Sequence, residues 1–165
     1  MDKRGLLAMA MEREKGGYEF YSRAAEITGD VKGKEMFAWL AQQEIGHFNS
    51  LRNLVDALKS SAQAEPIQLS VEDARQLEDL SNSEAQGNVT ATTTALEALQ
   101  IAMDAERASI ELYRRAERNT VDLAAKTMFS EMVAEEQAHL LMLEAQYQAV
   151  EKSQAFRAME EFANL

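Results

Sequence analysis

The chain contains one long internal repeat. Shifted by 92 positions, residues 7–51 align without a gap to residues 99–143, and 16 of the 45 pairs are identical. Unrelated positions of ordinary composition would match at roughly 6–7%. Two copies of so long a unit are too few for a solenoid, so we expect a duplicated structural unit. The identical pairs include Glu14/Glu106, Tyr21/Tyr113, Glu44/Glu136 and His47/His139.

Composition and periodicity predict that this unit is helical. The 165 residues include one proline, and Ala, Leu, Glu, Gln, Met and Lys dominate, all of which are good helix formers. No stretch alternates apolar and polar residues over the length of a strand. In the first copy, apolar residues recur at helical spacing on both sides of a break at Gly29 and Asp30. In the second, Thr94–Glu97 is a capping box, and a break near Thr120–Asp122 separates two helices. Each copy is therefore predicted to be a helical hairpin.

The segments outside the repeat complete the predicted architecture. The connection is rich in Ser and Thr and contains one short helix candidate, Val71–Leu80. A long connection lets the second hairpin reverse across a bundle. The C-terminal Ser153–Leu165 is either a short fifth helix or an extension of the fourth. We predict a single all-α domain, residues 1–165, a four-helix bundle with hairpin 1 at about 3–60, a crossover at about 61–93, hairpin 2 at about 94–150 and a short C-terminal helix at about 153–164.

Charge and targeting signals exclude several functional classes. The formal net charge of −11 repels phosphate backbones, so we expect no nucleic-acid partner. No apolar run approaches the roughly 20 residues that span a bilayer, and the charged N-terminal segment is unlike a signal peptide. The absence of cysteine excludes disulfides and thiolate metal sites. We expect a cytoplasmic protein with no membrane partner.

The two histidines of the chain carry one motif. His47 lies three residues after Glu44, and His139 lies three residues after Glu136. Residues three apart on a helix project from neighbouring points of one face, so a carboxylate and an imidazole at this spacing can bind one metal ion together. One such pair is a weak signal, but both copies of the repeat contain it.

The spacing from the turns brings two more glutamates to the same level. Glu14 and Glu44 lie about 15 residues before and after the first turn, which is about 22 Å along each helix. Glu106 and Glu136 are related in the same way to the second turn. Four buried carboxylates are very costly without compensation, and two divalent cations would balance their four negative charges. Oxygen and nitrogen ligands together suit iron or manganese, with zinc as an alternative.

Glutamates on helices one and three, with Glu-x-x-His on helices two and four, form the di-iron pattern of ferritin-like bundles. The segment Ala10–Tyr21, together with Glu44-x-x-His47, resembles the rubrerythrin family. The resemblance covers roughly residues 5–60 and 94–150, and it implies a ferritin-like fold with two iron ions. It implies the metal ligands Glu14, Glu44, His47, Glu106, Glu136 and His139. It further implies that Tyr21 and Tyr113, which share the inward face, donate hydrogen bonds to ligand carboxylates; the alternative is that they are ordinary core aromatics.

The resemblance also implies a function. Such a protein would be an oxidoreductase of oxidative stress, a peroxidase or ferroxidase that reacts with peroxide or dioxygen, with Glu44 and Glu136 bridging the ions. Full-length family members carry a rubredoxin iron centre, which a cysteine-free chain lacks, so we expect an external electron donor such as a separate rubredoxin-type protein. Family members also have a further glutamate three residues after the helix-three ligand, where this chain has Ser109.

Two other functions remain open at this stage. The bundle could bind iron for storage or delivery without catalysis, or it could act only through protein contacts, although the complete ligand set argues against the latter. A homodimer is compatible with the sequence. Near the ligands, Glu19 and Glu111 lie about 140° around the helix from them and are predicted to face solvent. Gln43 and Glu135 are predicted to be polar surface.

Overall fold

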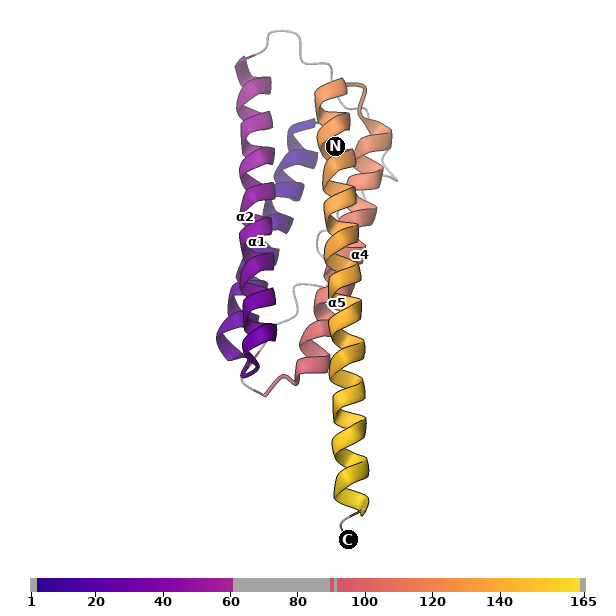
Figure 1. Cartoon of the computed structure of the whole chain (residues 1–165). Coiled ribbons are helices and arrows are strands. Elements are labelled where there is room, and N and C mark those ends of the chain that lie inside the picture. Colours follow the sequence, from indigo (N-terminus) through magenta and orange to yellow (C-terminus); the bar gives the residue numbers. More distant parts are fainter. Residues whose placement is uncertain (1–2, 61–89, 91, 164–165) are drawn as a thin grey trace.

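The computed structural model describes residues 3–60, 90 and 92–163, and Figure 1 shows two helical hairpins side by side. The helices are α1 (Lys3–Ile27), α2 (Val31–Ser60), α4 (Ala95–Asn119) and α5 (Leu123–Ala163). The described residues contain no strand. This confirms the predicted all-α bundle of two hairpins. The predicted crossover lies almost entirely outside the described residues, as does the helix candidate 71–80.

Side-chain caps fix the ends of the helices where the sequence predicted them. Asp30 accepts a 2.7 Å hydrogen bond from the backbone of Gly33, and Asp122 accepts one of 2.9 Å from Ala125. Thr94 and Glu97 form the predicted capping box at the start of α4. Such caps satisfy backbone N–H groups that have no partner within the helix. The two short turns therefore set the relative register of the helices in each hairpin.

Every helix crosses two apolar layers with a polar level between them. The layer nearer the α1–α2 turn and the start of α4 includes Tyr21, Phe37, Leu40, Leu99, Met103 and Leu143. The other layer includes Leu6, Leu7, Leu51, Leu112, Tyr113, Phe129 and Met132. Along each helix, the predicted ligands fall between the two sets. Two water-excluding layers therefore enclose the level at which the glutamates and histidines meet.

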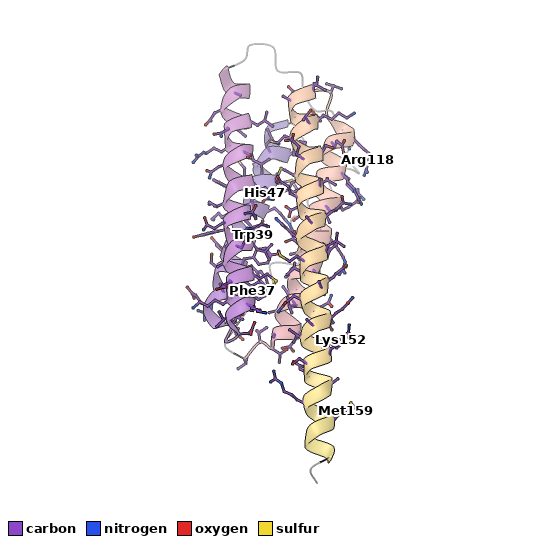
Figure 2. All side chains as sticks on the ribbon, in the orientation of Figure 1. Phe37, Trp39, His47, Arg118, Lys152 and Met159 are labelled. Atoms are coloured by element: carbon purple, nitrogen blue, oxygen red, sulfur yellow. The ribbon has the colours of Figure 1, made fainter. Side chains whose placement is uncertain are left out.

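The C-terminal segment corrects one part of the predicted architecture. Residues 153–163 do not form a separate short helix but continue α5, which runs for 41 residues to Ala163. Figure 1 shows this end of α5 projecting beyond the bundle, and Met159 on it is exposed (Figure 2). The extension was the second of the two alternatives that the sequence left open. None of the described helices is long and apolar enough to cross a membrane.

Candidate metal centre

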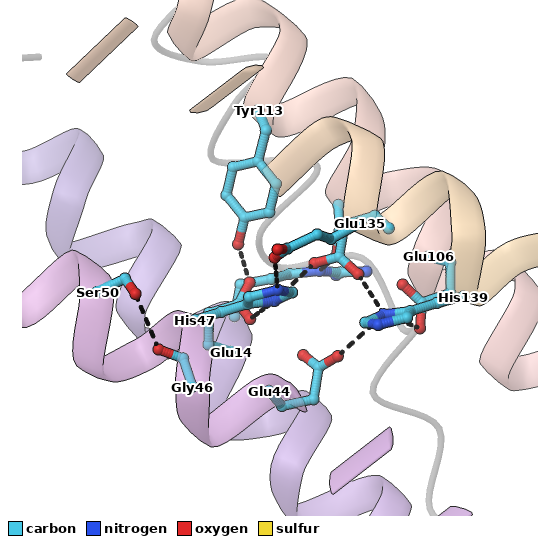
Figure 3. Close-up of polar contacts among 12 residues, drawn as sticks. Glu14, Glu44, Gly46, His47, Ser50, Glu106, Tyr113, Glu135 and His139 are labelled. Atoms are coloured by element: carbon cyan, nitrogen blue, oxygen red, sulfur yellow. Dashed lines mark hydrogen bonds and ion pairs between the residues drawn. The ribbon is translucent and has the colours of Figure 1, made fainter. Parts of the chain in front are cut away.

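The structure brings all six predicted ligands together in the middle of the bundle (Figure 3). Each of the four helices contributes at least one of these residues, and each of the six residues is less than one-tenth exposed. The residues are Glu14 on α1, Glu44 and His47 on α2, Glu106 on α4, and Glu136 and His139 on α5. The antiparallel pairing of equally spaced positions therefore gives the single level that the sequence predicted.

The ligand atoms form two overlapping clusters. In the first, atoms of Glu14, Glu44, His47 and Glu136 all lie within 4.8 Å of one another. In the second, the same holds for Glu44, Glu106, Glu136 and His139. Glu44 and Glu136 belong to both clusters, whereas each of the other four belongs to one. The geometry therefore offers two adjacent metal positions that share two carboxylates.

The two histidines have different hydrogen-bond partners. His47 Nδ1 lies 3.0 Å from Glu14 Oε2, and its Nε2 lies 2.6 Å from Glu135 Oε2. His139 Nδ1 lies 2.9 Å from Glu136 Oε2. The two rings stack with centroids 5.8 Å apart. Both imidazoles thus have a nitrogen directed at the carboxylates of the core.

Two tyrosines tie the hairpins together across the site. Tyr21 on α1 donates a hydrogen bond to Glu106 on α4, and Tyr113 on α4 donates one to Glu14 on α1. Both tyrosines are fully buried. In the structure each tyrosine thus donates to a glutamate of the other hairpin. Such outer contacts orient ligand groups and tune their basicity.

Burial and mutual repulsion disturb the ionisation of the carboxylates. Burial raises the pKa of Glu44 well above its ordinary value, and repulsion from Glu14 and Glu136 raises it further. Burial also raises the pKa of Glu106, with repulsion from Glu136 adding to it. For Glu14, burial raises the pKa, although the hydrogen bond to His47 opposes the shift. Three of the four carboxylates are therefore unstable as anions in the metal-free core.

The pKa values of His47 and Glu136 are shifted in the directions expected for an ion pair. Burial alone would lower the pKa of His47, but its contacts with Glu136 and Glu14 outweigh burial and raise the pKa to about 11. Burial would raise the pKa of Glu136, but hydrogen bonds to His139 and His47 outweigh it and lower the pKa. A proton on His47 therefore replaces part of the positive charge that the four carboxylates demand.

Two carboxylate oxygens show that this compensation is incomplete. Within the described part of the chain, Glu44 Oε1 and Glu136 Oε1 are buried and accept no hydrogen bond of normal geometry. Each has a longer contact with an imidazole nitrogen, His139 Nδ1 at 3.9 Å and His47 Nδ1 at 3.3 Å. A buried acceptor that is not fully hydrogen-bonded is costly. Both belong to the residues shared by the two clusters, so metal ions at the two positions would satisfy them. Oxygen and imidazole donors in this ratio fit iron, manganese or zinc.

Sequence reasoning missed two neighbours of the site. Glu135 is exposed at 58% of its side chain, as predicted for polar surface, but its carboxylate also contacts His47 on α2. Trp39, labelled on α2 in Figure 2, lies edge-on to the His139 ring, with ring centroids 5.5 Å apart. By contrast, Glu19 is exposed and Glu111 partly exposed, as predicted. The short-range signal for Glu135 was its position beside a ligand, which alone does not fix a side chain's direction.

A buried set of four glutamates and two histidines, contributed by all four helices of two hairpins, defines the class of ferritin-like carboxylate bundles. Within that class the chain belongs to the rubrerythrin family, whose sequence pattern matches residues 6–147. Its fold is similar to the solved structure of a hypothetical protein from Pyrococcus furiosus, with a TM-score of 0.64 and 24% identity over 87% of this chain and 86% of that chain. No curated protein matches the sequence.

Proposed function

We propose that the chain is a di-iron oxidoreductase that reacts with hydrogen peroxide or dioxygen. The observation that carries the proposal is the pair of overlapping clusters that share Glu44 and Glu136. Two ions held by common carboxylates lie close enough to act together in a two-electron step. Membership of the rubrerythrin family supports iron as the metal. When bound, the iron pair would supply one electron from each ion to the oxidant.

The residues of the chain have distinct roles in this proposal. Glu44 and Glu136, which belong to both clusters, would hold both ions. Glu14 with His47 would hold one ion only, and Glu106 with His139 would hold the other. Loading requires that His47 lose the proton favoured by its raised pKa, since only a neutral imidazole binds metal. Metal binding should therefore release protons.

The hydrogen bonds around the ligands hold the terminal carboxylates in place. Tyr113 donates to one oxygen of Glu14, and Tyr21 donates to one oxygen of Glu106. The other oxygen of Glu14 lies 3.0 Å from His47 Nδ1, a contact that a metal ion between the two groups would replace. The apolar layers on both sides keep bulk water from the centre. This arrangement supports the proposed roles, because Glu44 and Glu136 are the residues that belong to both clusters.

Anaerobic loading with iron(II), followed by rapid mixing with peroxide or dioxygen, tests the proposal. We expect two iron ions per chain and one fast oxidation, which is monitored through the absorbance in the near-ultraviolet. The described chain has no cysteine-bound iron to return electrons, so sustained turnover should need an added donor such as a rubredoxin-type protein. No oxidation of a fully loaded protein would contradict the proposal.

The alternative is an iron-binding protein for storage or delivery. The acidic overall charge would attract cations and so favours it. Stoichiometry separates the two functions: uptake that continues well beyond two ions per chain indicates storage, whereas saturation at two with rapid oxidation indicates the enzyme. The expected placement in the cytoplasm remains a prediction.

A further inference from the structure

A small cavity lies beside the metal centre on the side where α1 meets α4. Its volume is about 20 Å³, which exceeds the roughly 10–15 Å³ that one water molecule needs. Its inner wall includes the buried Glu44 and Glu106, and its outer wall includes the half-exposed Gly16 and Gly17. The cavity therefore leads from the surface to one carboxylate of the shared pair and is too small for an organic substrate.

A buried guanidinium forms part of this cavity. Arg13 is only 4% exposed. Its Nε donates a 2.9 Å hydrogen bond to Ser109 Oγ, and its Nη2 donates to the backbone oxygen of Ala105. Among the described residues, Nη1 has no hydrogen-bond partner and no carboxylate pairs with Arg13. The cavity thus contains the buried positive charge of Arg13, whose hydrogen-bond partners are both neutral. Its Nη1 group is a donor without an acceptor among the described residues.

The repeat shows that this cavity belongs to one copy only. The counterpart of Arg13 in the second copy is Ala105, and that of Gly17 is Ser109. A Cβ atom on residue 17 would lie 2.5 Å from Glu44 Oε2, so glycine is what lets Glu44 approach α1 here. Arginine and glycine at these two positions therefore distinguish this face of the site from the related face of the second hairpin.

Charge balance indicates the kind of ligand that would fit. Two divalent ions neutralise the four glutamates, which leaves the positive charge of Arg13 uncompensated inside the protein. Burying an unpaired charge is costly. One monovalent anion at Nη1 would remove both the excess charge and the unsatisfied donor. A divalent or larger anion would fit neither the charge nor the volume.

We propose that Arg13, held by its hydrogen bond to Ser109, binds one small monovalent anion in the cavity beside Gly17, next to Glu44 and Glu106. The proposal rests on the two-ion site of the proposed function. It does not depend on redox chemistry, because the charge argument holds for any divalent ion. The site would place an anion at the half-exposed side of the metal centre.

Azide binding to the zinc(II)-loaded protein, measured by titration calorimetry, tests this site without any oxidation. We expect one azide per chain, displaced by chloride but not by sulfate, which is larger and divalent. Arg13→Gln should weaken azide binding by about tenfold to a hundredfold, as expected for a lost charge-assisted hydrogen bond. Arg23→Gln is the matched control, because Arg23 is an exposed arginine of the same helix, paired with Glu26, and it should leave the affinity unchanged.

A second variant keeps the test decisive if Arg13→Gln does not fold. Ser109→Glu would place a carboxylate beside Arg13 and supply the anion within the chain, so azide binding should be lost while two zinc ions still bind. Ser109→Ala, which leaves the cavity open, should retain it. Equal azide affinity in the wild type, Arg13→Gln and Ser109→Glu would overturn the proposal, as would equal displacement by sulfate. If two zinc ions bind but iron shows no oxidation, the proposed function fails and the anion site stands.

Discussion

The two halves of the candidate metal centre have the same types of ligand but differ in what surrounds them. Each half has a terminal glutamate, a Glu-x-x-His pair and a tyrosine from the opposite hairpin. Around the first histidine, His47, lie Glu14 and Glu135, whereas the second, His139, is next to Trp39. The small cavity with Arg13 opens only on the side of Glu44 and Glu106. The duplicated unit has thus kept its inner residues and changed its outer ones.

Physical cost explains why the copies differ in this way. With metal bound, losing one inner carboxylate would leave a buried positive charge without its partner, which typically costs about 3–5 kcal/mol. Outer residues such as Glu135 and Trp39 are partly exposed, so water can replace their contacts. The inner residues are therefore constrained twice, by folding and by metal binding, and the outer ones are free to make the two halves different.

The largest expected effect comes from changing a residue that both halves share. Glu44→Gln should abolish the two-ion site and the oxidation of iron(II), because it removes a carboxylate from both clusters. Glu14→Gln should weaken mainly the ion beside His47, because Glu14 belongs to one cluster. Elemental analysis after reconstitution and stopped-flow absorbance measure both results.

The Glu44→Gln substitution should have a favourable effect on the stability of the metal-free protein, although it removes metal binding. Burial and repulsion raise the pKa of Glu44, so its anion destabilises the folded state and glutamine should increase the melting temperature near neutral pH. Glu19→Gln is the control, since Glu19 is exposed, and it should change neither metal content nor oxidation. Full oxidation by the Glu44→Gln variant would contradict the assignment of the shared ligands.

The second effect concerns pH and distinguishes the empty from the loaded centre. Burial raises the pKa of Glu44, Glu106 and Glu14 in the folded protein above 4.5. The free energy of unfolding is therefore highest, as far as these groups are concerned, below pH 4.5, and it falls as the pH rises through their folded pKa values. The raised pKa of His47, about 11 against 6.5, causes a further loss above pH 6.5. Glu136 acts oppositely, because its lowered pKa costs stability only as pH falls below about 4.5.

The metal-free protein should therefore be most stable in mild acid and lose stability from about pH 5 towards pH 8. The loaded protein should show the reverse slope over this range, because protons compete with metal ions for the same ligands. Melting curves of both forms across pH test this expectation. Parallel slopes, or equal melting temperatures at neutral pH, would count against a buried metal centre.

The sequence was sufficient to predict the parts of the molecule that follow from spacing. The 92-residue repeat, the capping residues and the equal distances of Glu14 and Glu44 from their turn define the hairpins and the level of the site. These features are local or periodic, so each of them can be predicted from the sequence of a single helix or turn. The continuous α5 was left open, because the apolar stripe at Phe156 and Met159 fits a separate helix as well as an extension.

The contacts between hairpins could not be predicted in the same way. That Tyr21 donates to Glu106, and not to a glutamate of its own hairpin, depends on how closely α1 approaches α4. The Arg13–Ser109 hydrogen bond joins residues 96 positions apart, and the contact of the exposed Glu135 with His47 was not predicted. Each of these depends on the direction of a side chain at a helix–helix contact, which periodicity does not specify.

A smaller effect should show whether the tyrosines really serve the opposite half. Tyr21→Phe keeps the aromatic packing but removes the donor to Glu106, so it should weaken the ion beside His139 by about tenfold, as is typical for groups that orient ligands. Tyr113→Phe should do the same to the ion beside His47. Stepwise cobalt(II) titrations, compared with the exposed Tyr18→Phe, measure the difference. An effect of Tyr21→Phe on the His47 position would refute the crossed arrangement.

The smallest effect concerns the outer carboxylate that distinguishes the two histidines. Glu135→Gln makes position 135 identical to its counterpart in the first copy, Gln43. The Glu135 side chain is 58% exposed, and contacts with exposed charges contribute only about 0–1 kcal/mol. The buried partners Glu136 and Glu14 raise the pKa of His47, so in metal-free protein the variant should leave this pKa high and change the stability of the fold by less than about 1 kcal/mol.

Titration of the two histidine resonances by NMR, with chemical denaturation alongside, measures both quantities. Since His139 has no contact with Glu135 among the described residues, its resonance is an internal control that should not respond to the substitution. A fall in the pKa of His47 to near 6.5 would show that the exposed glutamate, and not the buried ones, controls this histidine. In that case the difference between the two halves would lie in their ionisation as well as in their surroundings, and loading of the first position alone would become less dependent on pH.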